Sequence, residues 1–114
     1  MLFIEAPTFT RLVHDYLDDD EYAALQLWLI LCRLAFYIWA LALRPEAGAI
    51  IPGSGGIRKL RWAAKGRGKR GGLRVIYYWR NRGSEIVLLT LYAKNEAENI
   101  PLNVLREMRK EIKS

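Results

Sequence analysis

A run of almost unbroken apolar residues between positions 23 and 43 constrains the fold of this chain more than any other feature. Only Gln26 and Arg33 interrupt the run. A surface helix of a small domain normally carries one apolar stripe, whereas a helix made from this run is apolar almost all round. We therefore expect more than the chain's own sheet to cover this helix.

Such a helix can be buried either in a membrane or against another protein surface. About 20 apolar residues can span a hydrocarbon core, but Arg33 near the middle of the run costs about 2.5–3.5 kcal/mol on insertion scales. Alternatively, the helix packs against a second copy of the chain or against a partner helix. We expect a soluble homo-oligomer formed through residues 23–43, or solubility only with a bound partner, and we do not expect a membrane span.

Hydrophobic periodicity and turn signals predict an α+β fold in a single domain of residues 1–114. Asp18 and the three acids after it are expected to cap the second helix. A loop rich in proline and glycine, residues 50–56, leads into the strands, and Gly83 is expected to supply a positive φ in the last hairpin turn. Helices are expected at residues 8–17, 20–43 and 101–113, and strands at 2–5, 57–63, 73–80 and 85 to 92 or 94.

The expected sheet is antiparallel and consists of a short N-terminal strand and a three-stranded meander. Two N-terminal helices and one C-terminal helix are expected to pack on one face and to leave the other open. Side chains alternate across a strand, so one face of the meander is cationic if Leu60, Val75 and Leu89 face the core. The open face then carries Lys59, Arg61, Arg74, Tyr92 and Lys94.

The net charge of +6 arises from the middle of the chain. Residues 1–46 carry three basic and seven acidic side chains and residues 85–114 carry five of each, whereas residues 47–84 carry ten basic side chains, no acid and all nine glycines. A basic segment with interleaved aromatic residues is typical of a protein that binds a polyphosphate backbone. A solvated basic loop, or a contact for an acidic protein, would have the same composition.

The expected open face contains no carboxylate and no histidine, the usual residues of acid–base catalysis. Chemistry at a phosphate depends mainly on positioning and on stabilising charge, which cations provide. The glycine-rich loop between the first two meander strands lacks the spacing of a nucleotide P-loop and is expected to wrap a nucleic-acid backbone. Its basic residues are Lys65, Arg67, Lys69 and Arg70.

The chain contains one cysteine, Cys32, and one histidine, His14. A disulfide framework and a Cys/His zinc cluster are therefore excluded, and we expect neither a metal nor a cofactor. The N-terminal residues do not have the pattern of a secretory signal, so the expected location is cytoplasmic.

Four segments of the chain carry a family resemblance. They read IPGSGGIRKLRW at 51–62, GKRGG at 68–72, RVIYY at 74–78 and LTLYAKNE at 89–96. In this order they resemble the RelE/HigB toxin family of bacterial toxin–antitoxin systems, and its HigB-type branch most closely. The resemblance implies an endoribonuclease that cuts mRNA in the ribosomal A site without metal and is held inactive by a cognate antitoxin.

The resemblance also implies roles for residues. Lys59 and Arg61 match a basic pair that orients the 2′-hydroxyl and supports its deprotonation, and Arg74 matches an arginine that stabilises the phosphorane-like transition state. Tyr92, or else Lys94, is expected to protonate the departing 5′-oxygen. RNA contacts are expected from Arg58, Lys65, Arg67, Lys69, Arg70 and Asn95.

The chain departs from this family in two places. It lacks both an arginine near Asn95 and a tyrosine in the last helix, which supply such groups in some relatives, and it carries an apparent apolar insertion at about residues 28–40. A non-catalytic RNA-binding protein that uses the same basic face is the alternative function.

Overall fold

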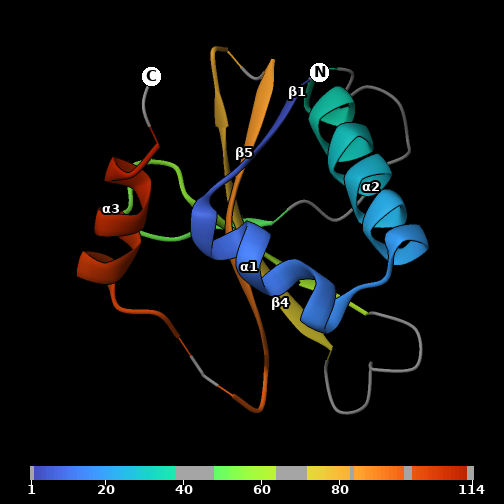
Figure 1. The fold of residues 1–114 in the computed structure, drawn as a ribbon. Helices are drawn as coiled ribbons and strands as arrows, with labels where there is room; N and C mark the ends of the chain where they lie inside the picture. The colour runs from blue at the N-terminus through green and yellow to red at the C-terminus, as the bar shows by residue number, and fades with distance from the viewer. Residues whose placement is uncertain (1, 38–47, 64–71, 83, 97–98, 113–114) are drawn as a thin grey trace.

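The computed structural model describes residues 2–37, 48–63, 72–82, 84–96 and 99–112 (Figure 1). Their order is β1 (Leu2–Glu5), α1 (Pro7–Tyr16), α2 (Asp19–Tyr37), β2 (Ala49–Ile50), β3 (Arg58–Trp62), β4 (Leu73–Arg80), β5 (Glu85–Ala93) and α3 (Leu102–Lys110). The α+β class is confirmed, and every predicted helix and strand occurs with small shifts at its ends. The part of the second predicted helix beyond residue 37 lies outside the described residues.

The strands form one five-stranded sheet in the order β1-β5-β4-β3-β2. The meander β3–β4–β5 is antiparallel as predicted, but β1 pairs with β5 in parallel, which makes the sheet mixed. Strand β2 was not predicted, because its two residues stand beside a proline- and glycine-rich loop and show no periodicity. It pairs antiparallel with the start of β3 and adds a short edge to the sheet.

Asp18, just before α2, and Glu21, in its first turn, cap the helix as predicted. The backbone N–H of Glu21 donates to Asp18 Oδ1 at 2.7 Å, and the backbone N–H of Asp18 donates to Glu21 Oε1 at 3.0 Å. This reciprocal pair is a capping box, which satisfies two backbone donors at the start of the helix. The capping box sets where α2 begins after the turn from α1.

Both faces of the sheet are covered, so the expectation of one open face is wrong for part of the sheet. Figure 1 shows α1 and α2 on one side of the sheet and α3 on the other. The core on the first side joins Phe9, Leu17 and Leu29 of the helices to the sheet residues Leu60, Val75, Tyr77, Ile86, Leu88 and Leu91. The second core is smaller and joins Leu105 of α3 to Ile57, Ile76, Tyr78, Val87, Leu89 and Tyr92.

A β-bulge changes which residues of β5 face each side. Ile76 pairs with Thr90 and Tyr77 pairs with Leu88, which leaves Leu89 as the extra residue of β5. Leu89 therefore packs on the α3 side, against expectation, and Leu91 takes its place opposite Val75 in the first core. From Thr90 to Tyr92 the side chains alternate between the two faces as predicted, because these residues lie beyond the bulge.

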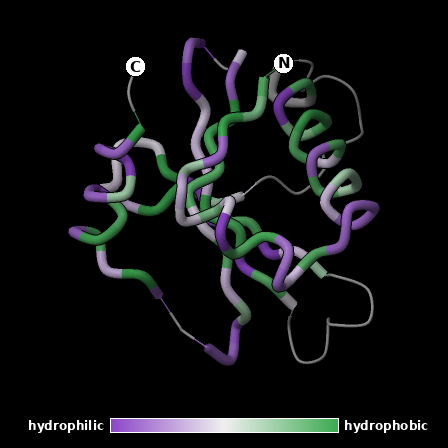
Figure 2. Tube along the Cα trace, viewed as in Figure 1, coloured by the Kyte–Doolittle hydropathy of each residue, from purple (hydrophilic) through white to green (hydrophobic). Residues whose placement is uncertain are grey.

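The β4–β5 turn is hydrophilic at its tip (Figure 2). Positive φ angles occur there at Asn81 (52°) and Arg82 (56°), the two residues before Gly83, and Gly83 itself lies outside the described residues. Asparagine tolerates this conformation because its short side chain bonds locally. The sequence therefore indicated the turn, but two non-glycine residues adopt the left-handed conformation.

Helix α2 is only partly covered by the rest of the chain. Leu25 and Leu29 are fully buried against the sheet. Three other leucines, spaced at i, i+4 and i+7, stay exposed on the helix: Leu27, Leu31 and Leu34. None of the helices within the described residues is both long enough and apolar enough to cross a membrane.

Candidate nucleic-acid interface

The register of the meander places the predicted cationic residues in rows. Arg61 pairs with Arg74, and Arg74 pairs with Tyr92, so these three residues lie side by side across β3, β4 and β5. Lys59 lies one row along, opposite Ile76. The structure thus brings four of the five predicted catalytic residues to one face, the same face on which α3 packs. We use the name cationic row for Arg61, Arg74 and Tyr92 together with Lys59, which lies beside them on the same face.

The cationic row has a buried floor and an exposed rim. Arg74 and Tyr92 retain 8% and 7% of their exposure, whereas Lys59 is half-buried and Arg61 is exposed. The Arg74 Nη1 group donates to the Leu73 carbonyl oxygen at 3.4 Å. A phosphate that approaches this face would therefore meet the exposed charge of Arg61 first and the buried charge of Arg74 deeper in the site.

The Tyr92 hydroxyl is buried in the floor of the row. Burial raises the pKa of its hydroxyl above the ordinary value of 10, and the positive charge of Arg74 offsets only part of that effect. The phenol is therefore protonated at neutral pH. Among the described residues, the Tyr92 hydroxyl makes no hydrogen bond, although it is buried. A buried polar group without a partner is costly, so a ligand that reached this hydroxyl would gain a hydrogen bond there.

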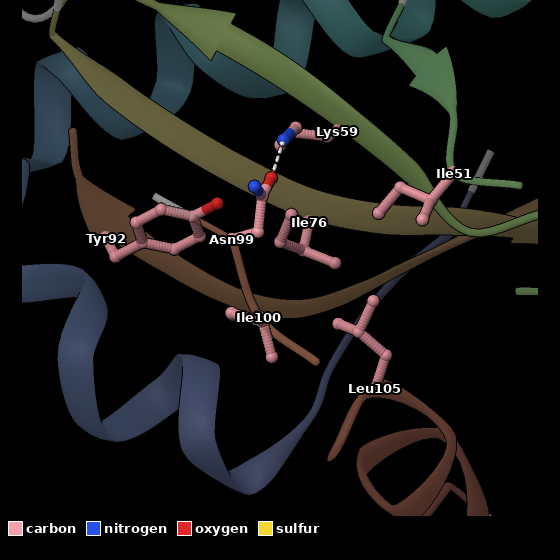
Figure 3. Close-up of a pocket in the computed structure, with 7 residues that line it drawn as sticks. All are labelled: Ile51, Lys59, Ile76, Tyr92, Asn99, Ile100 and Leu105. Atoms are coloured by element: carbon pink, nitrogen blue, oxygen red, sulfur yellow. Dashed lines mark hydrogen bonds between the residues drawn. The ribbon is translucent and has the colours of Figure 1, made fainter. Parts of the chain in front are cut away.

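A pocket of about 130 Å³ adjoins the cationic row (Figure 3). Lys59 stands at its edge, where Nζ donates to Asn99 Oδ1 at 2.8 Å. Asn99 belongs to the segment between β5 and α3, and sequence reasoning missed it because no motif includes it. The residues that line the pocket are Ile51, Lys59, Ile76, Tyr92, Asn99, Ile100 and Leu105.

The turn after β5 carries Lys94 and Asn95, and both are exposed. Glu96 holds this turn, because its Oε1 accepts the backbone N–H of Ala93 at 2.9 Å and the hydroxyl of Tyr16 from α1. The Tyr16 hydrogen bond, followed by that from Ala93, lowers the pKa of Glu96. Sequence reasoning also missed this contact, because its two side chains are 80 positions apart.

Arg58 lies away from the cationic row. It points to the α1/α2 face, where its guanidinium carbon lies 4.1 Å from the centroid of the Trp79 ring and its Nη1 donates to the Gly48 carbonyl oxygen at 2.8 Å. Arg33 of α2 approaches the same ring at 4.4 Å and donates to the Arg82 carbonyl oxygen at 2.8 Å. These arginines join the helix and the sheet by cation–π contact.

The basic loop residues predicted to bind RNA, namely Lys65, Arg67, Lys69 and Arg70, lie outside the described residues. The end of the loop is described at Gly72, whose φ is +65°. A Cβ atom there would lie 2.4 Å from the Trp62 carbonyl oxygen, so the close approach of β3 and β4 requires glycine. In the part of the chain that the structure describes, no group of three or more His, Cys, Asp or Glu residues could hold a metal ion.

The chain is similar to known toxins in sequence and in fold. Residues 46–114, more than half of the chain, match the family described as the RelE toxin of the RelE/RelB toxin–antitoxin system. The structure resembles that of the E. coli toxin RelE, solved in the free state with two arginines changed to alanine, at a TM-score of 0.58 and 11% sequence identity. The match covers 95% of each chain, and at this identity it establishes the fold. By its sequence match, supported by this shared fold, the chain belongs to the RelE toxin family.

Proposed function

We propose that this toxin is an endoribonuclease that cleaves mRNA on the ribosome. The observation that carries the proposal is the cationic row, in which Arg61, Arg74 and Tyr92 lie side by side across three strands. The row combines fixed positive charge with a protonated hydroxyl. Cleavage of RNA by its own 2′-hydroxyl needs positive charge near the phosphoryl oxygens and a proton for the departing oxygen.

The reaction proceeds by attack of the substrate's own 2′-hydroxyl. Lys59 and Arg61 orient this hydroxyl, and their charge favours its oxyanion as its proton passes to water. The 2′-oxygen forms a bond to phosphorus while Arg74 stabilises the negative charge on the phosphoryl oxygens. The bond from phosphorus to the 5′-oxygen breaks, and that oxygen takes the Tyr92 proton. The products are a 2′,3′-cyclic phosphate and a 5′-hydroxyl, and solvent reprotonates Tyr92.

Cleavage mapping on translating ribosomes tests this mechanism. Arg74→Ala should slow cleavage about 10²- to 10³-fold, as expected for loss of one group that stabilises an oxyanion. Tyr92→Phe removes the proton donor and should slow cleavage by about 10² or more. Arg106→Ala serves as the control, because Arg106 is on α3 and its Nη2 donates to the Gly53 carbonyl oxygen. Equal mRNA profiles for the unmodified chain and Arg74→Ala would contradict the enzymatic proposal.

A non-catalytic RNA-binding protein is the second candidate. The near-complete burial of Tyr92 favours it, because a donor below the rim must still reach the departing oxygen. This candidate predicts RNA affinity that falls with salt and no cleavage even on translating ribosomes.

We also propose that a cognate antitoxin binds this toxin and covers the cationic row with acidic residues. The proposal follows from the family and from the positive charge of the exposed rim. Co-purification with the product of the adjacent gene, and rescue of growth by that gene, are the expected results. A toxic chain that no neighbouring gene rescues would contradict this partner.

A further inference from the structure

The pocket beside the cationic row differs in chemistry from the row itself. Its walls are mainly aliphatic side chains from three parts of the chain: Ile51 before β3, Ile76 on β4, and Ile100 and Leu105 around the start of α3. Figure 3 shows Lys59 and Asn99 at one side of this apolar space and the Tyr92 ring at another. An apolar slot therefore opens directly beside the groups proposed to handle the phosphate.

The size of the pocket suits one planar ring. Its volume is about 130 Å³, and an apolar cavity of about 150 Å³ is known to accept benzene. A flat aromatic group buries its faces against aliphatic walls and keeps its polar edge at the mouth. The pocket is thus close to the size of one six-membered ring, so a pyrimidine, or the six-membered part of a purine, would enter it while the rest of the nucleotide stays at the mouth and its phosphate lies toward the cations.

Polar groups at the pocket distinguish its ligand from a simple apolar side chain. The buried Tyr92 hydroxyl has no hydrogen-bond partner among the described residues, and an aliphatic ligand would leave it so. The Asn99 side chain is exposed, and while its Oδ1 accepts from Lys59 its amide N–H groups can donate to the edge of a base. The positive charge of Lys59 also favours a ligand that is itself anionic.

We propose that this pocket receives the base of the nucleotide next to the phosphate held by Arg74, and that Asn99 reads the edge of that base. This inference rests on the proposed function, since it names a part of the RNA substrate that the same site binds. It makes the pocket a determinant of which nucleotide stands beside the cleaved bond.

The test measures binding without chemistry. Isotope-labelled methyl groups of Ile76 and Ile100 are followed by NMR while the protein is titrated with AMP, GMP, CMP or UMP, and separately with ribose 5-phosphate. A base in the pocket shifts these methyl signals by its ring current, and ribose 5-phosphate does not. Because the base buries apolar surface in the pocket and ribose 5-phosphate does not, at least one nucleotide should bind about tenfold tighter than ribose 5-phosphate. Equal affinities and unmoved methyl signals would overturn the proposal.

Two variants make the test specific to the pocket. Ile100→Phe fills the space from a half-buried position and should abolish the preference for nucleotides over ribose 5-phosphate. Its matched control is Leu102→Phe, because Leu102, the first residue of α3, is also partly buried but does not line the pocket. Asn99→Ala changes an exposed side chain and should reduce discrimination among the four nucleotides. Retention of the full discrimination in Asn99→Ala would overturn its role as the reader.

The failure of this inference is distinguishable from failure of the proposed function. If Arg74→Ala leaves mRNA cleavage unchanged while Ile100→Phe loses nucleotide binding, the catalytic proposal fails and the base pocket stands. If cleavage depends on Arg74 but the methyl signals respond only to the antitoxin, the pocket accepts a protein side chain and the nucleobase proposal fails.

Discussion

Arg58 and Arg61 stand three residues apart on β3 and lie on opposite faces of the sheet. Arg58 packs on the Trp79 ring and donates to the Gly48 carbonyl oxygen. Arg61 is exposed and lies beside Arg74 on the face that α3 covers only in part. The two arginines belong to the same basic segment of the sequence, but one joins elements of the fold and the other is free to meet a ligand.

The two faces differ in what surrounds their charges. On the α1/α2 face, the helices bury most of the apolar sheet residues, and Arg58 is accommodated there by stacking on the Trp79 ring. On the other face, α3 is short: Arg74 and Tyr92 are buried there, but Arg61 at the rim stays exposed. The packing of a basic residue, and not its place in a basic segment, therefore decides whether its charge is available to a ligand.

The largest expected effect concerns stability on the α1/α2 face. Leu88→Ala removes a fully buried side chain from the first core and should lower the free energy of unfolding by about 2–5 kcal/mol. The cleavage rate per folded molecule should not change, because Leu88 points away from the cationic row. Denaturant titration measures the loss. Leu27→Ala, at an exposed leucine of α2, is the control and should change stability by less than about 0.5 kcal/mol. Similar losses in both variants would break the comparison.

A paired substitution on β3 tests the contrast directly. Arg58→Ala loses a cation–π contact and a hydrogen bond and should cost about 1–2 kcal/mol of stability, with the salt dependence of RNA binding unchanged. The Arg61→Ala variant should be as stable as the unmodified chain. The slope of log RNA affinity against log salt concentration should decrease in magnitude by about one. Thermal unfolding and RNA titration at several salt concentrations provide both readouts. The opposite pattern would mean that Arg58 contacts RNA and that its stacking contributes nothing.

A smaller effect is expected from the contact that holds the turn after β5. Tyr16→Phe removes the hydrogen bond to Glu96 and should lower the free energy of unfolding by about 0.5–1.5 kcal/mol. In this variant Glu96 still accepts the Ala93 N–H, so the turn should keep its shape. The cleavage rate should therefore fall by a smaller factor than the folding equilibrium constant. Tyr22→Phe, which removes a similar hydrogen bond to Glu5 away from this turn, is the matched control for cleavage.

The pH dependence of stability gives the same contact a second readout. The pKa of Glu96 is lowered in the folded chain, so its contribution is present above the ordinary value of 4.5 and is lost as pH falls through the folded value. Burial, and then the Glu96 hydrogen bond, raises the pKa of Tyr16 to about 12. Its contribution is therefore complete below pH 10 and is lost as pH rises toward about 12. Tyr16→Phe should flatten both ends of the profile, and an unchanged profile would contradict the contact.

The smallest effect on stability is expected at the exposed leucines of α2. Leu27→Lys with Leu31→Lys should change the stability of a single chain by less than about 0.5 kcal/mol per site, because neither side chain is buried. The same change should convert the expected homo-oligomer into single chains in light scattering. His14→Lys on α1 adds charge at another exposed position and should leave the assembly intact. A monodisperse monomer of the unmodified chain in detergent-free buffer would contradict the oligomer.

Local patterns were enough to predict much of the cationic row. Alternation along β3 placed Lys59 and Arg61 on one face, and the same rule placed Arg74 and Tyr92 on their strands. Those predictions agree with the structure because period-2 alternation depends only on the backbone of each strand. The capping box at Asp18 was predictable for the same reason, since both of its partners lie within one helical turn.

Other features depend on contacts between distant segments, and only the tertiary structure decided them. The parallel pairing of β1 with β5 and the bulge at Leu89 arise where strands meet, so no single strand encodes them. Arg33 interrupts an apolar run because it meets the Trp79 ring from another element, which its neighbours in sequence do not reveal. Asn99 reaches Lys59 from 40 positions away. The sequence by itself determined which residues lie on each strand and helix, through short-range periodicity; the folded chain decided which of those residues meet, because packing and hydrogen bonding act through space and not along the chain.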